Sequence, residues 1–399
     1  MLIDPAQSGM SIEQLSELSE GGNIVATFYL GMSYHLGLNT EPDQEKAIAC
    51  WRQAAEKNNM ESQYLLGQHY YFGKTVEQDY QTAAKWYRLA AEQGHVQAQL
   101  NLAAMLISGT GVKQDNALAK YCLEKAVEQD SSEACVTLGR LHEEGQGTPK
   151  DSAKAQTLYE KAIELNANNT DAIYSLAILI KEGQIPGKAS IEAMTLLEKA
   201  ADKDHMLAQL ELGKIFFYGS IALQDYSKSY QWLSKAAVHN NVIADYHLGL
   251  MLVQGLGIEK DVPKAIEHFT KSANAGMAES AYVLGMMYYQ GMDTEKNPAQ
   301  AIHWFELLAQ KNSMDAQFLL GTIHEEELEK IDEAVRWYTL AAESGCDKSQ
   351  YNLARLYHTH PSDIKDISKA HYWYQQCVAS SQTPELIDNA KKGLLAVAV

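Results

Sequence analysis

The sequence predicts an all-α solenoid, a stack of about ten helix-turn-helix repeats with a capping helix at each end. Three observations predict it: a short motif that recurs ten times, small residues at fixed places around each copy, and the apolar periodicity of amphipathic helices. The 399 residues are 46% hydrophobic and 21% charged, as in an ordinary folded protein. A repeated unit therefore replaces the two or three domains that this length would otherwise suggest.

The first helix of each repeat, here called helix A, carries Leu followed by Gly or Ala. This Gly or Ala, here called the anchor, recurs every 36 residues, with one spacing of 38 and one of 33. Five residues before it stands Ala or Ser in all ten repeats. Small residues at both places predict that two helix backbones approach closely. The ten anchors are Gly31, Gly67, Ala103, Gly139, Ala177, Gly213, Gly249, Gly285, Gly321 and Ala354.

The second helix, helix B, starts near a small residue that lies 16 positions after most anchors. This residue is Ala in nine repeats and Ser229 in the other. The segment 83–91 shows the pattern best, with apolar or small residues at i, i+3, i+4, i+7 and i+8. That spacing forms one buried stripe on an amphipathic helix. Each repeat is therefore expected to be a pair of helices.

Glycine, aspartate and asparagine mark the predicted helix ends. Eight repeats have Gly six residues after the anchor, where helix A should end, and eight have Asp or Asn where a side-chain oxygen can cap helix B. Helix B should end at a residue type that tolerates a left-handed backbone. In the first nine repeats these residues are Asn58, Gly94, Asp130, Asn166, Asp204, Asn240, Gly276, Asn312 and Gly345.

These signals predict the boundaries of the whole chain. Residues 1–22 should hold the N-terminal capping helix, and residues 382–399 the C-terminal one, opened by Thr383 and Pro384. Residues 23–381 should form the ten repeats, at 23–58, 59–94, 95–130, 131–166, 167–204, 205–240, 241–276, 277–312, 313–345 and 346–381.

The motifs resemble the Sel1-like repeat, a branch of the tetratricopeptide-repeat superfamily. The second repeat is similar from Ser62 to His95, and residues 109–112 supply the Gly-x-Gly-Val loop. The resemblance implies a right-handed superhelix with helix A on the concave side. It also implies a non-enzymatic adaptor of bacterial or eukaryotic signalling and assembly. The evenly spaced cysteines of exported, disulfide-linked members are missing, so the β-lactam activity associated with them is not carried over.

Charge and cysteine content limit the partners and the compartment. The chain has 33 Lys+Arg and 51 Asp+Glu, a net charge of −18, which argues against nucleic acid. No apolar stretch approaches the roughly 20 residues of a membrane span, and no signal peptide is visible before Lys46. Five cysteines without a CxxC pair suit a reducing compartment. We expect a cytoplasmic protein; non-classical secretion and the oligomeric state stay open.

No catalytic, cofactor or metal site is predicted. His142 and His324 take a helix A position that is Tyr in four other repeats, which favours packing over chemistry. A metal site from His358, His360 and His371 is a weak alternative, since no carboxylate partner is evident. The Gly-x-Gly loops recur at one place in the repeat, so they are turns rather than phosphate loops. Cys50, Cys122 and Cys377 should be core thiols, and Cys346 could be exposed.

Function is expected on one face of helix A, where positions six and two before the anchor and one and five after it line up. Nine of these forty residues are acidic and four are basic. An apolar series among them suggests a surface for a protein or peptide, neutral to basic in charge. The alternative is that the series closes a tight superhelix against itself. The predicted surface consists of Tyr218, Ile243, His247, Leu250, Val283, Met286 and Leu319.

A second hypothesis makes the chain a carbohydrate-binding or weakly hydrolytic module. Its basis is the tyrosine content, 22 residues in all. Tyr29, Tyr71, Tyr218 and Tyr289 could stack on sugar rings.

Overall fold

The computed structural model describes residues 10–360 and 364–398, and every regular element in these ranges is an α-helix. A capping helix, α2 (Ile12–Glu20), precedes the repeats, and α23 (Pro384–Val397) follows them. Helix A of the successive repeats is α3 (Ile24–Leu36), α5 (Met60–Phe72), α7 (Val96–Ser108), α9 (Ser132–Glu144), α11 (Thr170–Lys181), α13 (Met206–Tyr218), α15 (Val242–Gln254), α17 (Ala278–Gln290), α19 (Met314–Glu326) and α21 (Asp347–Thr359). Helix B is α4 (Gln44–Glu56), α6 (Tyr80–Glu92), α8 (Asn116–Val127), α10 (Ser152–Leu165), α12 (Ser190–Ala201), α14 (Tyr226–Val238), α16 (Val262–Asn274), α18 (Pro298–Ala309), α20 (Ile331–Glu343) and α22 (Ile367–Ser380).

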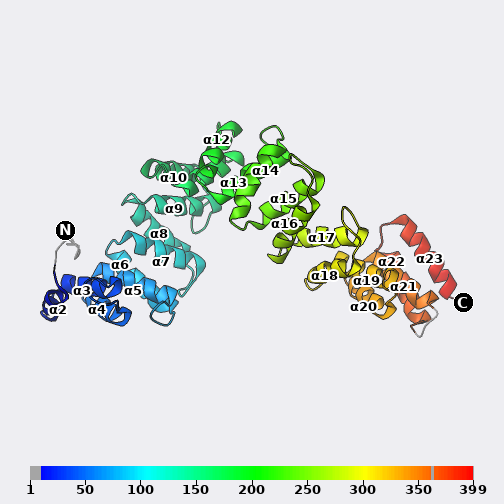
Figure 1. The fold of residues 1–399 in the computed structure, drawn as a ribbon, viewed down its shortest axis with the longest axis horizontal. Coiled ribbons are helices and arrows are strands. Elements are labelled where there is room, and N and C mark those ends of the chain that lie inside the picture. The colour runs from blue at the N-terminus through cyan, green and yellow to red at the C-terminus, as the bar shows by residue number, and fades with distance from the viewer. Residues whose placement is uncertain (1–9, 361–363, 399) are drawn as a thin grey trace. The chain divides into compact units, whose positions relative to one another are not determined.

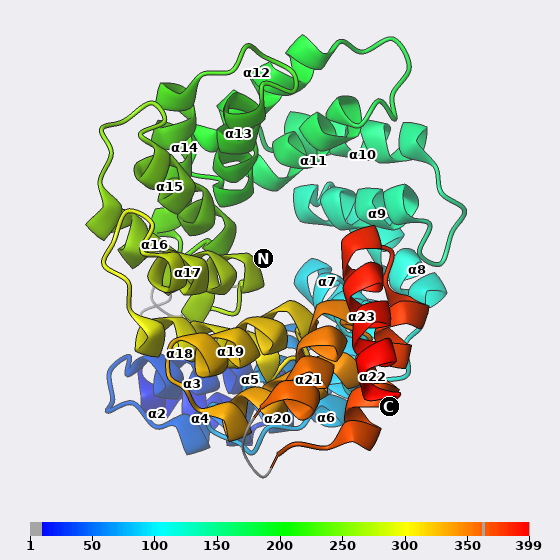
Figure 2. The ribbon, with the colours of Figure 1, turned by 90° about the vertical axis from the view of Figure 1, so that its right-hand side faces the viewer.

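The helices form two compact units, one ending at His205 and the other beginning at Met206. Within each unit, helix A packs on helix B of its own repeat, and helix B packs on helix A of the next repeat (Figures 1 and 2). This arrangement confirms the predicted all-α solenoid. None of the described helices is long and apolar enough to cross a bilayer.

The anchors lie where helices A and B of one repeat touch. A Cβ atom at Gly285 would lie 2.5 Å from Cε1 of Phe305, and one at Gly249 would lie 2.6 Å from Cε1 of Phe269. Glycine is required there because an aromatic ring occupies the space of a side chain. Phe269 and Phe305 are fully buried at the centre of the largest hydrophobic cluster of the second unit.

The helix ends follow the predicted residues with one exception. All eight predicted glycines after helix A have a positive φ, and all eight predicted Asp or Asn residues accept a backbone N–H bond in the first turn of helix B. The prediction of a left-handed backbone after helix B is wrong only at Asn166, whose φ is −144°. There α10 ends in a turn that includes the two additional residues, and Oδ1 of Asn166 accepts a bond from the N–H of Asn168 at 3.0 Å.

The two capping helices differ in how they begin. Ser11 and Gln14 form a reciprocal capping box at α2, in which Ser11 Oγ accepts from the Gln14 N–H and Gln14 Oε1 accepts from the Ser11 N–H. Thr383 precedes α23 without a capping bond from its side chain, and Pro384 occupies the first turn. Residues 1–9 and 399 of the predicted caps lie outside the described residues.

Helix α12 offers a test of the capping rule. Its N-cap residue, Ala189, has an extended backbone but no side-chain oxygen. Ala189→Asp or Ala189→Asn should therefore stabilise the first unit by about 1 kcal/mol, because either side chain can accept an N–H bond of the first turn. Urea unfolding followed by circular dichroism measures the shift. A gain for Asp but none for Asn would show that charge, and not capping, is responsible.

Candidate functional site

The residues of the predicted partner surface lie on helix A of the sixth to ninth repeats, all within the second compact unit. Tyr218 ends α13; Ile243, His247 and Leu250 belong to α15; Val283 and Met286 belong to α17; and Leu319 belongs to α19. They fall into two groups. Tyr218, Ile243 and His247 form one connected group, and the other four residues are half-buried.

His247 joins α13 to α15 beneath the most exposed residue of the surface. The hydroxyl of Tyr218 lies 3.1 Å from Nε2 of His247, and Nδ1 of His247 lies 2.9 Å from the carbonyl oxygen of Ile243. A carbonyl only accepts, so Nδ1 carries the proton and Nε2 accepts from Tyr218. Tyr218 is 60% exposed and Ile243 37%, whereas His247 is only 5% exposed. His247 therefore positions Tyr218 instead of offering the exposed side chain that the sequence suggested.

The environment of His247 disfavours protonation of its imidazole. Burial lowers the pKa of His247; the hydrogen bond to the carbonyl of Ile243 acts against this shift, and the positive charge of Lys214 adds to it. The rings of Phe217, Tyr218 and Tyr246 stand nearly perpendicular to the imidazole, at centroid distances of 5.2, 5.8 and 5.4 Å. Edge-to-face packing of this kind is favourable for aromatic rings. Tyr218 is thus held at the surface by one hydrogen bond and a set of ring contacts.

The other four predicted residues connect the surface to the core. Leu250, Val283, Met286 and Leu319 are partly buried and pack against the cluster around Phe269 and Phe305. Each side chain therefore contacts both the interior and the solvent. This arrangement gives α15, α17 and α19 an apolar floor, and it means that substitutions here change the core as well as the surface.

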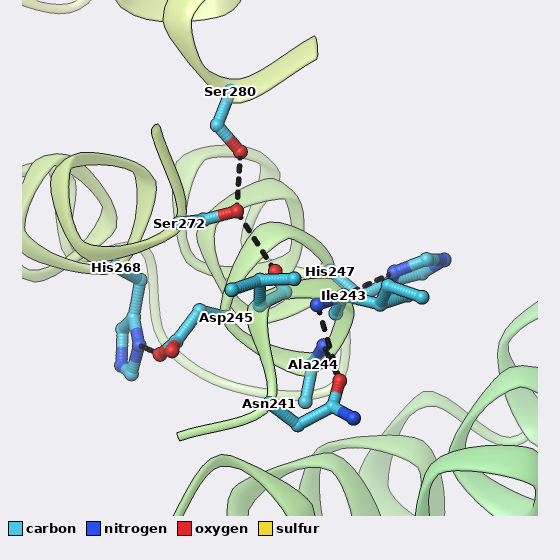
Figure 3. A network of polar contacts seen from close by, with 9 residues as sticks. Asn241, Ile243, Ala244, Asp245, His247, His268, Ser272 and Ser280 are labelled. Atoms are coloured by element: carbon cyan, nitrogen blue, oxygen red, sulfur yellow. Dashed lines mark hydrogen bonds and ion pairs between the residues drawn. The ribbon is translucent and has the colours of Figure 1, made fainter. Parts of the chain in front are cut away.

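A buried polar network links α15, α16 (Val262–Asn274) and α17, as Figure 3 shows. The hydroxyl of Ser280 on α17 donates to Ser272 on α16 at 2.8 Å, and Ser272 donates to the carbonyl of Val242 on α15 at 2.8 Å. On α15 the buried carboxylate of Asp245 lies 2.7 Å from Nδ1 of His268. Satisfied polar networks of this kind fix one arrangement of neighbouring helices.

The charged residues beside the surface are mainly acidic. Glu279, Asp315 and Glu326 are exposed on α17 and α19. The carboxylate of Glu211 on α13 lies 3.1 Å from the ammonium of Lys214 on the same helix. The apolar floor thus has mainly acidic residues beside it.

The histidines that resemble catalytic or metal-binding residues are buried or half-buried. His142 and His324 are buried, and burial lowers the pKa of each imidazole. The ring of His358 lies against Tyr374, with centroids 6.2 Å apart. Within residues 10–360 and 364–398, no group of three His, Cys, Asp or Glu residues is placed to hold a metal ion. His142 and His324 are therefore part of the packed interior.

The cysteines and tyrosines singled out in the sequence are mostly internal. Cys122 and Cys377 are buried and Cys50 is half-buried. The expected exposure of Cys346 is wrong: this thiol is buried because α21 starts directly after it, so the side chain packs at the helix junction. Among the tyrosines proposed to stack on sugars, Tyr29, Tyr71 and Tyr289 are half-buried, and only Tyr218 is largely exposed.

The structure also reveals an apolar pocket that the sequence analysis missed, on the same helix A face of the first two repeats. It has a volume of about 270 Å³, and Leu36 and Phe72 are exposed at its edge. Both residues lie five positions after their anchors, so the signal was present in the sequence. The pocket is lined by Met32, His35, Leu36, Trp51, Leu65, Gln68, His69, Phe72 and Lys74.

Comparison with protein families gives one match that covers almost all of the chain. The profile of the Sel1 repeat matches ten times, at residues 24–59, 61–95, 96–131, 132–166, 170–205, 207–240, 242–277, 278–313, 315–346 and 347–376. No match was found among curated protein sequences.

Two similar solved structures carry the same repeat. One is a protective antigen of uropathogenic Escherichia coli, c5321, with 28% identity and a TM-score of 0.65 over 98% of this chain and 90% of that chain. The other is a Sel1 repeat protein from Oxalobacter formigenes, with 26% identity and a TM-score of 0.65 over 78% of this chain and 90% of that chain. Both likenesses agree with the helix pairs described above.

Proposed function

Because this chain belongs to the Sel1 repeat family, whose members are generally scaffolds for protein interactions, we propose that it is a non-enzymatic adaptor for a protein or peptide segment. The segment binds on the helix A face of α13, α15, α17 and α19. The observation that carries this proposal is the exposed pair Tyr218 and Ile243, of which Tyr218 is hydrogen-bonded to His247, beside a half-buried apolar floor.

The chemistry of this face suggests how a segment would bind. Tyrosine at the centre of an interface contributes apolar area and a hydrogen bond at low entropic cost. A partner helix or extended segment would place an apolar side chain between Tyr218 and Ile243, and Lys or Arg beside Glu279 and Asp315. We therefore expect a neutral to basic partner, bound more weakly as ionic strength rises.

The test uses the two exposed residues rather than the half-buried ones, because Leu250 and Met286 also support the core. The double variant Tyr218→Glu, Ile243→Glu should bind amphipathic peptides with a lysine-rich polar face at least about tenfold more weakly than the unchanged protein. Fluorescence anisotropy with labelled peptides measures this loss. The helical signal should stay unchanged, and thermal unfolding should stay cooperative.

A matched control carries the same two charges elsewhere on the second unit. Leu223 and Val238 are exposed and lie outside helix A, so Leu223→Glu, Val238→Glu should keep peptide binding. Peptides with a glutamate-rich polar face should bind neither form. Equal binding by the two double variants, or preference for the acidic peptides, would exclude this face as the partner site.

A further inference from the structure

An open cavity lies in the first compact unit beside α6 and α8, the B helices of the second and third repeats. It has a volume of about 480 Å³ and is open to solvent. This size, with a mainly apolar lining and a few polar groups, is typical of a small-molecule site. Ala91, Leu102, Leu118 and Cys122 are among its apolar lining residues.

The repeat pattern explains why this cavity exists. Three positions after the small residue that opens helix B, five repeats have tryptophan, and each of these rings is buried or half-buried. They are Trp86, Trp232, Trp304, Trp337 and Trp373. The third repeat has Cys122 at this position, a much smaller side chain than an indole, and it lines the cavity beside α6; the remaining repeats have Cys50, Leu158, Leu196 and His268 there.

The border of the cavity offers one free positive and one free negative charge. Lys125 is already paired with Glu128, at 2.7 Å, and the amide of Gln129 donates to Gln99 at 3.2 Å. Arg88 and Glu92 lie one turn apart on α6, and neither has an ion pair among the described residues. The exposed ring of Tyr121 also lines the cavity.

We propose that this cavity binds a free aromatic amino acid or a close planar relative with both charges. The ring lies on the apolar floor beside Cys122 and Leu102, where it takes the place of the missing indole. Its carboxylate faces Arg88 and its ammonium faces Glu92. Tyr121 covers the ring from the solvent side by aromatic stacking.

The experiment titrates L-tryptophan into the full-length protein and follows binding by saturation-transfer NMR and calorimetry. A ligand of this size should bind with a dissociation constant on the order of 1 mM or below. Cys122→Trp, which fills the cavity, should weaken binding at least about tenfold, while Cys122→Ala, which leaves the space open, should keep it. Tyr121→Ala changes an exposed residue and should fold normally but bind less tightly.

Three results would overturn the proposal. The first is no saturation transfer at about 5 mM L-tryptophan, far above the expected constant. The second is that a folded Cys122→Trp variant binds L-tryptophan as tightly as the unchanged protein does. If that variant does not fold, the same result for Tyr121→Ala would overturn the proposal. The third is that tryptamine and indole-3-acetate bind with the same affinity as L-tryptophan. Each of them lacks one of the two charges that Arg88 and Glu92 are assigned to recognise.

Discussion

Gly285→Ala should destabilise the second compact unit by roughly 1–3 kcal/mol, the usual effect of overfilling a packed core. The added Cβ would stand 2.5 Å from the ring of Phe305, a distance that cannot persist without a shift of the ring or of α17. Because Phe305 is fully buried against neighbouring helices, the ring has little room to move. Urea unfolding at the tyrosine and tryptophan bands measures the change.

The chain itself supplies the compensating change. The third, fifth and tenth repeats have an alanine anchor. In the third and fifth, a fully buried leucine stands twenty residues later, where Phe305 stands in the eighth: Ala103 with Leu123, and Ala177 with Leu197; in the tenth, Tyr374 stands there after Ala354. Adding Phe305→Leu to Gly285→Ala recreates this pair. Phe305→Leu alone should destabilise by leaving a cavity, so the double variant should be more stable than the sum of the two single effects predicts. Additive effects would show that the anchor and the ring do not constrain each other.

Mild acid should weaken the fold through four buried histidines, His69, His142, His247 and His324. Burial is the main cause that lowers the pKa of each imidazole in the folded chain. The unfolded chain therefore binds more protons below about pH 6.5, and stability falls as the pH decreases through that value. The slope can reach about 1.4 kcal/mol per pH unit for each such histidine. Carboxylates ordinarily take up protons at lower pH than histidines do. The change in stability between pH 5.5 and 7.5 therefore reports on the histidines.

Two substitutions separate packing from protonation. Tyrosine stands at the position of His142 and His324 in four other repeats, at Tyr34, Tyr70, Tyr288 and Tyr357. His142→Tyr with His324→Tyr should keep the fold and reduce the difference between urea midpoints at pH 7.5 and 5.5. His303→Tyr removes an exposed histidine and should leave that difference unchanged. An unchanged difference in the first variant would mean that neither buried imidazole contributes to acid sensitivity.

The architecture was predictable because the same sequence signals recur in most of the ten repeats. The anchors, the glycines after helix A and the caps of helix B depend on contacts within one repeat, and local sequence specifies them. Asn166 departs from the pattern because two additional residues allow a different turn. Cys346 departs because burial at a helix junction depends on how the next helix packs, which spacing alone does not determine.

The candidate sites were less predictable, since exposure results from neighbouring helices. His247 shares a helix face with Ile243, yet contacts from α13 cover its ring and leave Ile243 accessible. The pocket at Leu36 and Phe72 and the cavity at Cys122 are gaps between repeats. A gap appears only when the surrounding side chains are placed, although the missing tryptophan at Cys122 was readable in the sequence.

The contact between anchor and ring has a consequence for how such a chain can evolve. Gly249 and Phe269 belong to one repeat, as do Gly285 and Phe305. A gene segment that encodes one repeat therefore encodes both the anchor glycine and the aromatic ring that packs against it. Copying or losing that segment changes the length of the protein by one helix pair without leaving an unmatched glycine or ring. Surface residues can then diverge in each copy, and a lineage can acquire new specificities by unequal recombination.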